Sequence, residues 1–167
     1  MKLLIIRHAL AGDKAGFSRT GRPDSLRPLT AEGRGKMRKA AKGLLALVVE
    51  IELLASSPFA RAAQTADIVA KRFGVKPVLV PELAADRKPK DLLPWLKAQS
   101  SKEAVAVVGH EPYLGWLASL LLSGSEASYL QLRKGGACLL EFTRAAAPGR
   151  ARLLWALTCS QLRRLGR

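Results

Sequence analysis

Short apolar runs without alternating polar residues are the feature that most constrains the fold of this chain. They cover residues 2–6, 53–56, 78–80 and 104–108. Strands that are buried on both faces of a parallel sheet have this character. Segments with helical periodicity separate the runs. This alternation predicts a three-layer α/β/α sandwich with a mostly parallel central sheet, in one domain over residues 1–167.

The expected helices begin and end at residues that favour such positions. Thr30 is a candidate N-cap for a helix over about 31–48, whose apolar residues recur at a spacing of three to four. Pro58 suits the first position of the next helix, and Gly74 suits the residue just after its end. Further helices are expected over about 90–98 and 112–122.

The remaining segments are predicted as late strands, a long loop and a tail. β-like patterns cover residues 129–132, 137–142 and 152–157. Residues 9–28 are rich in Gly, Pro, Ser, Asp and Arg, and a loop of this length usually has a function. The basic tail over about residues 160–167 could be disordered.

Cysteine and histidine are scarce, which argues against several classes of site. Cys138 and Cys159 cannot form a disulfide framework, and we interpret both as buried small residues of late strands. With two histidines in the chain and no Asp/Glu cluster, we expect neither a metal centre nor a cofactor.

The balance of charge points to anionic partners. The formal net charge is +15, and the excess lies in residues 1–50 and 133–167. Such a surface attracts phosphorylated substrates, nucleic acid, polyphosphate or acidic protein faces, or it serves only solubility. No apolar run approaches the ~18–20 residues that span a bilayer. The apolar N-terminal stretch is too short for a signal peptide, so we expect a cytoplasmic protein with no membrane partner.

Polar side chains follow each of the first four expected strands. Arg7 and His8 come after the first, Arg61 lies early in the helix after the second, Glu82 follows the third, and His110 follows the fourth. Ligands bind at the carboxyl ends of strands in open α/β sheets. Each residue alone has an ordinary structural explanation. Two histidines and two arginines beside helix N-termini together predict a pocket for a phosphoryl group.

Three segments carry a resemblance to a known family. They are Arg7-His8-Ala9, the run Ser57-Pro58-Phe59-Ala60-Arg61-Ala62-Ala63-Gln64-Thr65-Ala66, and Gly109-His110-Glu111. These match, in order, three signatures of the histidine phosphatase (phosphoglycerate mutase-like) superfamily. The segments Asp24-x-x-Arg27-Pro28-Leu29-Thr30-x-x-Gly33 and Pro81-Glu82-Leu83 resemble the SixA-type phosphohistidine phosphatases in particular.

The resemblance implies a role for each matching residue. His8 would be the nucleophile that accepts the phosphoryl group, and Arg7, Arg61 and His110 would bind its oxygens. Physical chemistry is consistent with this, because phosphoryl transfer depends mostly on positioning and on neutralising charge. The neighbouring arginines should lower the pKa of His8 and keep it neutral for attack. The resemblance also implies that neither metal nor cofactor is needed.

Glu82 has two interpretations. Many members of the superfamily carry an acidic proton donor near this point, so Glu82 could be a general acid. It could equally be a solvated loop carboxylate or an ion-pair partner of Arg87. An imidazole leaving group has a conjugate-acid pKa of about 6.5 and needs such an acid less than an alkoxide does.

Three functions remain open at this point. The first is a phosphohistidine phosphatase that acts on a signalling protein, which suits an open site bordered only by residues 9–28 and 84–92. The second is a phosphatase of the same superfamily that acts on a small phosphomonoester. The third is a non-catalytic module that binds polyphosphate or nucleic acid. Nucleic acid is disfavoured, because aromatic residues make up only 5% of the chain.

Overall fold

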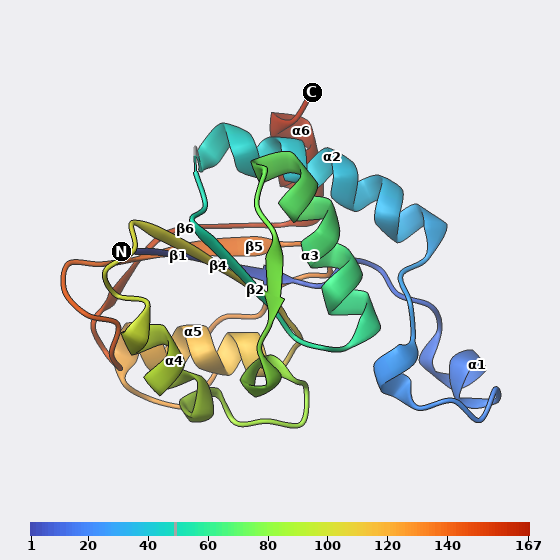
Figure 1. Cartoon of the computed structure of the whole chain (residues 1–167), viewed down its shortest axis with the longest axis horizontal. Helices are drawn as coiled ribbons and strands as arrows, with labels where there is room; N and C mark the ends of the chain where they lie inside the picture. Colours follow the sequence, from blue (N-terminus) through green and yellow to red (C-terminus); the bar gives the residue numbers. More distant parts are fainter. Residues whose placement is uncertain (49) are drawn as a thin grey trace.

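The computed structural model describes residues 1–48 and 50–167, and six strands in it form one mixed sheet in the order β3-β2-β4-β1-β5-β6 (Figure 1). The strands are β1 (Lys2–Arg7), β2 (Leu53–Ser56), β3 (Pro77–Leu79), β4 (Ala104–Gly109), β5 (Ala137–Phe142) and β6 (Ala151–Leu157). The first four pair in parallel, and β5 and β6 add antiparallel strands beside β1. The expected sandwich with a mostly parallel sheet is therefore confirmed.

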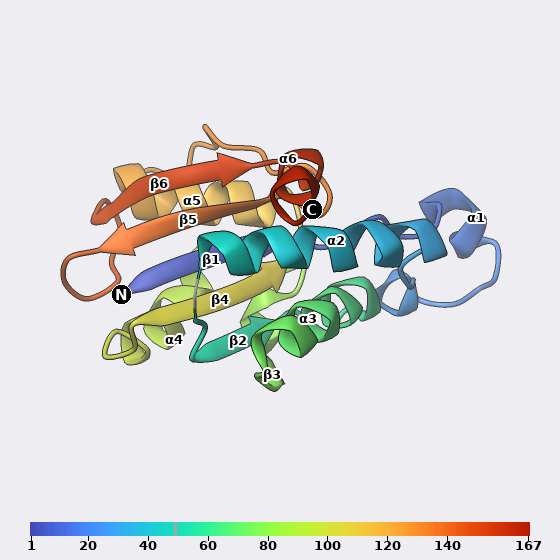
Figure 2. The same cartoon turned by 90° about the horizontal axis from the view of Figure 1, so that it is seen from above.

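Helices cover both faces of the sheet (Figure 2). They are α1 (Lys14–Ser18), α2 (Ala31–Leu47), α3 (Ala60–Phe73), α4 (Leu93–Ala98), α5 (Tyr113–Ser123) and α6 (Cys159–Leu165). Successive side chains of β1 point to opposite faces of the sheet. Leu4 and Ile6 pack in the layer with α2 and α3, whereas Leu3 and Ile5 pack with α5. This burial on both faces explains the unbroken apolar pattern of the strand.

The second long helix begins later than the sequence suggested. Pro58 and Phe59 form a turn, and α3 starts at Ala60. The Phe59 N–H donates to Ser57 Oγ over 3.3 Å, which holds the bend before the helix. In the described part of the chain, no side chain caps the first turn of α3. The end of α3 is as expected, because Gly74 has φ of 70° in the left-handed region.

One prediction near the end of the chain was wrong, and the conformation of the tail, which the sequence left open, can be described. Residues 129–132 form no strand, and the Leu132 N–H instead donates to the Glu111 carboxylate over 2.8 Å. The basic tail is not disordered, since residues 159–165 form α6 and its Leu162 is fully buried. Thr158 caps this helix by accepting from the Gln161 N–H.

The two cysteines differ in their surroundings. Cys138 is fully buried in β5, as expected. Cys159 is half-buried and begins α6 rather than lying in a strand. Both are free thiols. In the part of the chain that the structure describes, no helix has the length and apolar character needed to cross a membrane.

The long loop of residues 9–28 is held at both of its ends. It contains α1 and a 3₁₀ turn at Asp24–Leu26. Ala11 and Leu29 pair as an isolated β-bridge, and Arg27 Nη1 donates to the Gly12 carbonyl over 2.7 Å. These contacts bring the 3₁₀ turn back to the carboxyl edge of the sheet, beside the predicted site.

Candidate active site

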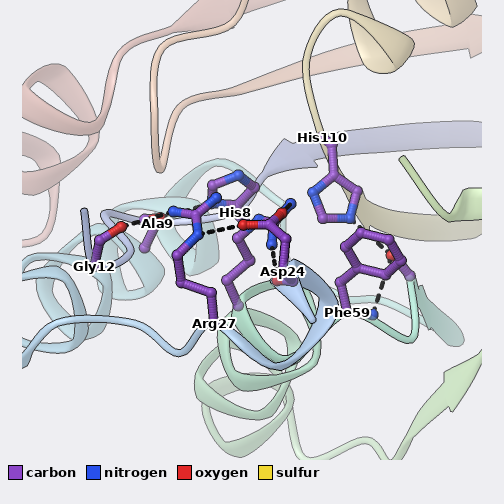
Figure 3. Close-up of polar contacts among 9 residues, drawn as sticks. His8, Ala9, Gly12, Asp24, Arg27, Phe59 and His110 are labelled. Carbon is purple, nitrogen blue, oxygen red and sulfur yellow. Dashed lines mark hydrogen bonds and ion pairs between the residues drawn. The ribbon is translucent and has the colours of Figure 1, made fainter. Parts of the chain in front are cut away.

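The carboxyl ends of β1 and β4 lie side by side because these strands are neighbours in the sheet. Arg7 pairs with Gly109 at the end of the ladder, so His8 and His110 both follow directly after paired residues. Their ring centroids are 5.2 Å apart. Both rings border a hollow of about 650 Å³ that is also lined by Arg7, Asp24, Arg27, Arg61, Glu111 and Lys134. Figure 3 shows His8, Asp24, Arg27 and His110 close together.

His8 is held in one tautomer. Its Nδ1 lies 2.7 Å from the Ala9 carbonyl oxygen, which can only accept, so this nitrogen carries the proton. In the neutral ring, Nε2 then has the free lone pair that a nucleophile needs. The side chain is only 7% exposed. Burial, with help from the charges of Arg61 and Arg7, lowers the pKa of His8 to about 4, so the ring is neutral at pH 7.

His110 is the more deeply buried of the two, with 2% of its surface exposed. Its Nε2 lies 2.8 Å from Ser57 Oγ, a contact that fixes the orientation of the ring. Burial first, and then the neighbouring His8 and Arg61, lower the pKa of His110 to about 3. Its Nδ1 is buried without a hydrogen-bond partner among the described residues.

Arg61 is placed by the first turn of α3 and is 5% exposed. Its Nη1 donates to the Asp24 carbonyl over 2.9 Å, and Nη2 forms an ion pair with the Asp24 carboxylate at 3.1 Å. Asp24 also accepts from Arg27 Nε over 2.7 Å. The carboxylate therefore holds two guanidinium groups at the edge of the hollow, and these two cations lower the pKa of Asp24.

Arg7 approaches the hollow from the end of β1. Its Nη1 donates to the Leu132 carbonyl over 2.7 Å. The Glu111 carboxylate accepts from the Leu132 N–H, so both side chains contact the same residue. Burial raises the pKa of Glu111, and the charge of Arg7 acts in the opposite direction. The pair links the strand ends of β1 and β4 through the segment before β5.

Thr65 joins the loop that follows β1 to α3. Its hydroxyl donates to the Arg61 carbonyl over 2.7 Å and accepts from the Ala9 N–H over 3.0 Å. Thr65 is fully buried. The backbone that carries His8 and the helix that carries Arg61 are therefore joined through one side chain.

Buried nitrogen atoms without partners gather at this site. Three of the four in the described residues are Arg7 Nε, Arg61 Nε and His110 Nδ1. An unpartnered buried donor is costly, and proteins seldom keep one without a ligand or water to satisfy it. Three around one hollow, together with the guanidinium charge, form a site suited to a tetrahedral oxyanion.

Glu82 lies apart from this group. It is half-buried in a 3₁₀ turn after β3, and its carbonyl accepts from the Tyr113 hydroxyl over 2.8 Å. Its side chain does not line the hollow, although Ala85 does. Among the described residues its carboxylate has no ion pair, with Arg87 or with any other cation.

Sequence reasoning did not assign Asp24, Arg27 and Lys134 to the site. Asp24 and Arg27 belonged to a quoted segment, and their spacing of three residues suits a turn in which the two side chains pair. The contact between Asp24 and Arg61 could not be predicted, because the two residues lie far apart in the sequence. Lys134 lies in the turn before β5 and had no signal beyond its charge.

The residues that the structure describes contain no group of three or more His, Cys, Asp or Glu side chains that could hold a metal ion. Arg7, Arg27, Arg61 and Lys134 bring positive charge to the hollow. Fold and site together thus define an α/β protein with a pocket lined by histidines and arginines, whose charge suits a phosphate-like anion.

Similarity to known proteins identifies the family. Residues 3–87 match the sequence model of the histidine phosphatase superfamily (branch 1). The chain is 33% identical to the phosphohistidine phosphatase SixA of Escherichia coli strain K12 over 128 residues, which cover 74% of this chain and 76% of that protein. The chain therefore belongs to the histidine phosphatase superfamily.

Other similarities extend over most of the chain. An uncharacterized protein of Picosynechococcus sp. is 33% identical over 81% of this chain and 82% of its own length. A structure of the protein histidine phosphatase SixA complexed with tungstate superposes with a TM-score of 0.83 and 27% identity, covering 97% of this chain and 99% of that chain. A mycobacterial glucosyl-3-phosphoglycerate phosphatase shares the fold at a TM-score of 0.72 and 15% identity, over 94% and 99% of the two chains.

Proposed function

We propose that this phosphatase removes the phosphoryl group from a phosphohistidine of a signalling protein, through a covalent phosphohistidine on His8. One observation carries the proposal. His8 is neutral, its Nδ1 proton is fixed on the Ala9 carbonyl, and the same hollow is lined by Arg7, Arg61 and His110, each of which has a buried nitrogen without a partner among the described residues. A ready nucleophile thus lies beside donors for the oxygens of the group that it would accept.

In the first step, the Nε2 lone pair of His8 forms a bond to phosphorus. The bond between phosphorus and the leaving nitrogen breaks, and its electron pair stays on that nitrogen. The other nitrogen of the substrate ring takes a proton from solvent, so the ring departs as neutral imidazole. Arg7, Arg61 and His110 would bind the three equatorial oxygens, where the negative charge is spread. Arginine suits this role because it stays charged and offers several donors in one plane.

In the second step, water attacks the phosphorus of the His8 intermediate. The bond to Nε2 breaks, and the ring returns to the neutral form that the Ala9 contact favours. The protons of the water leave with the inorganic phosphate. No metal is needed in this scheme, because the arginines supply the positive charge, and activity should persist in EDTA.

The shape of the pocket supports a substrate on a protein. The hollow is open to solvent, and Lys14 and Lys134 border it with further positive charge. A phosphohistidine on a protein surface can reach such a site without a lid having to close. The same reaction needs no strong general acid, which agrees with the position of Glu82 outside the hollow.

The test compares kcat/KM for a phosphohistidine peptide with kcat/KM for small phosphomonoesters such as a sugar phosphate. We expect the peptide to be the better substrate, with activity unchanged by EDTA. Preference for a small ester would favour the second function, a small-molecule phosphatase of the same superfamily. Absence of turnover on every substrate would refute a phosphatase role and favour a binding module.

A further inference from the structure

A second basic hollow lies where α6 crosses α2. Figures 1 and 2 show these two helices side by side. Two glycines permit the close crossing. A Cβ on Gly43 would lie 1.9 Å from the Leu162 carbonyl oxygen, and one on Gly166 would lie 2.6 Å from the Lys39 carbonyl oxygen. The backbones therefore approach at a distance that only glycine allows, and the contact is specific rather than incidental.

This crossing gathers positive charge. A hollow of about 490 Å³ lies between the two helices. It is lined by the following polar side chains: Lys39, Lys42, Ser160, Arg163, Arg164 and Arg167. No Asp or Glu side chain lines it, and the side chains of its five cationic residues form no ion pair among the described residues. We refer to this feature as the α2/α6 hollow.

Such an arrangement is electrostatically unfavourable without a ligand. Like charges that are brought together repel, and the repulsion is relieved when an anion binds between them. Glu32 does not neutralise this charge, because its carboxylate pairs with Lys36; Lys36 first, and Arg163 to a smaller extent, lower the pKa of that carboxylate. Arg163 Nε is buried and has no hydrogen-bond partner in the described residues. It is the one such atom outside the active site, and it marks the same hollow.

We propose that the α2/α6 hollow binds a chain of linked phosphates, such as inorganic oligophosphate. Five cations within one hollow match several adjacent phosphates better than one isolated phosphate. No aromatic side chain lines the hollow, so bases could not stack there, which disfavours nucleotides and single-stranded nucleic acid. No residue is shared with the active site, and the inference does not depend on the proposed phosphatase function.

The test is calorimetric titration with sodium tripolyphosphate of the wild type and two double variants. Lys42→Ala with Arg164→Ala removes two exposed cations of the α2/α6 hollow. Lys97→Ala with Arg144→Ala removes two exposed cations elsewhere and serves as the matched control. Any binding in the active site is common to all three proteins. Circular dichroism reports folding independently of activity.

We expect the hollow variant to bind tripolyphosphate at least ~10-fold more weakly than the wild type, since charge-assisted hydrogen bonds are lost. The control should stay within about twofold, and affinity should fall as salt rises. Equal losses in the two variants, or no loss in either, would overturn the proposal. So would tighter binding of ATP, single-stranded DNA or polyglutamate than of tripolyphosphate at the hollow. Hydrolysis of p-nitrophenyl phosphate should be unchanged in both variants.

Discussion

The ends of the central strands and the end of the edge strand differ in what they contribute to the site. β1 and β4 are neighbours in the middle of the sheet, and they place His8 and His110 in contact across the hollow. β3 is at the edge, separated from β1 by β2 and β4. Glu82 follows it and does not line the hollow. Position in the sheet, more than order in the chain, decides which polar residues meet.

The residues that follow the central strands are also more buried than Glu82, which follows the edge strand. The groups after the central strands are enclosed, which lowers the pKa of both histidines and fixes each ring by one hydrogen bond. Glu82 is half-buried, and its side chain has no hydrogen bond among the described residues. We infer that the groups essential for catalysis follow the central strands β1 and β4, and that Glu82, after the edge strand β3, is at most an auxiliary group.

The largest effect is expected from His8→Ala. Loss of the nucleophile should lower turnover by at least ~10⁴-fold, as for other covalent catalysts. The fold should survive, because His8 lies at a strand end and not in the apolar core. Steady-state kinetics and circular dichroism on the same sample check both statements. Normal turnover by this variant would mean that the central strands do not hold the nucleophile.

Arg61→Ala should lower kcat/KM by at least ~100-fold, since it removes a donor to the developing charge. It should also weaken inhibition by vanadate. Lys71→Ala removes an exposed cation from the last turn of the same helix and is the control. Vanadate affinity that is equal in the two variants would show that Arg61 does not bind the anion.

Stability should depend on pH through the two histidines. Their pKa values are about 4 and about 3 in the folded chain, against 6.5 in ordinary surroundings. As pH falls below 6.5, the unfolded chain takes up protons that the folded chain does not. The free energy of unfolding should therefore fall with pH, by up to ~1.4 kcal/mol per pH unit for each histidine.

Urea unfolding at pH 7, 6 and 5 measures this dependence. The variant His8→Asn keeps a polar side chain without the titrating group, so its stability should fall less steeply than that of the wild type. Other titrating groups act equally in both proteins. Parallel curves for the two proteins would show that His8 titrates normally in the folded state.

The smallest effect is expected from Glu82→Gln with phosphohistidine. The loss there should be less than ~10-fold, because the imidazole departs readily. An alkyl phosphate has a basic leaving group, and the loss could reach the ~10²–10⁴-fold typical of a general acid. The comparison needs kcat/KM on both substrates and on p-nitrophenyl phosphate. Equal losses on all three would point to a structural role for the edge segment.

The fold was predictable because its central strands, β1 and β4, are buried on both faces, whereas β3 and β6 at the two edges are largely exposed. Unbroken runs such as residues 104–108 leave few alternatives once helices separate them. The ends of these runs alone were enough to place His8 and His110 at one edge of the sheet. The family assignment followed from signatures that lie at those same ends, and it is confirmed by sequence and structural similarity.

The sequence could not show contacts that depend on packing between distant segments. Asp24 reaches Arg61 because the long loop is closed by the Ala11–Leu29 bridge, and no local pattern encodes that closure. The basic tail looked disordered because its charges are frequent. Its order rests on one buried residue, Leu162, and on the small size of Gly43 in the facing helix.

The central claim is that His8 carries the phosphoryl group during turnover. Rapid quenching of the wild type with radiolabelled phosphohistidine peptide, followed by peptide mapping, tests it most directly. We predict label that is stable in alkali, labile in acid and confined to the peptide that contains His8. Label on Ser57 or another hydroxyl, which would survive acid, would contradict the account, as would turnover at full rate without any labelled protein.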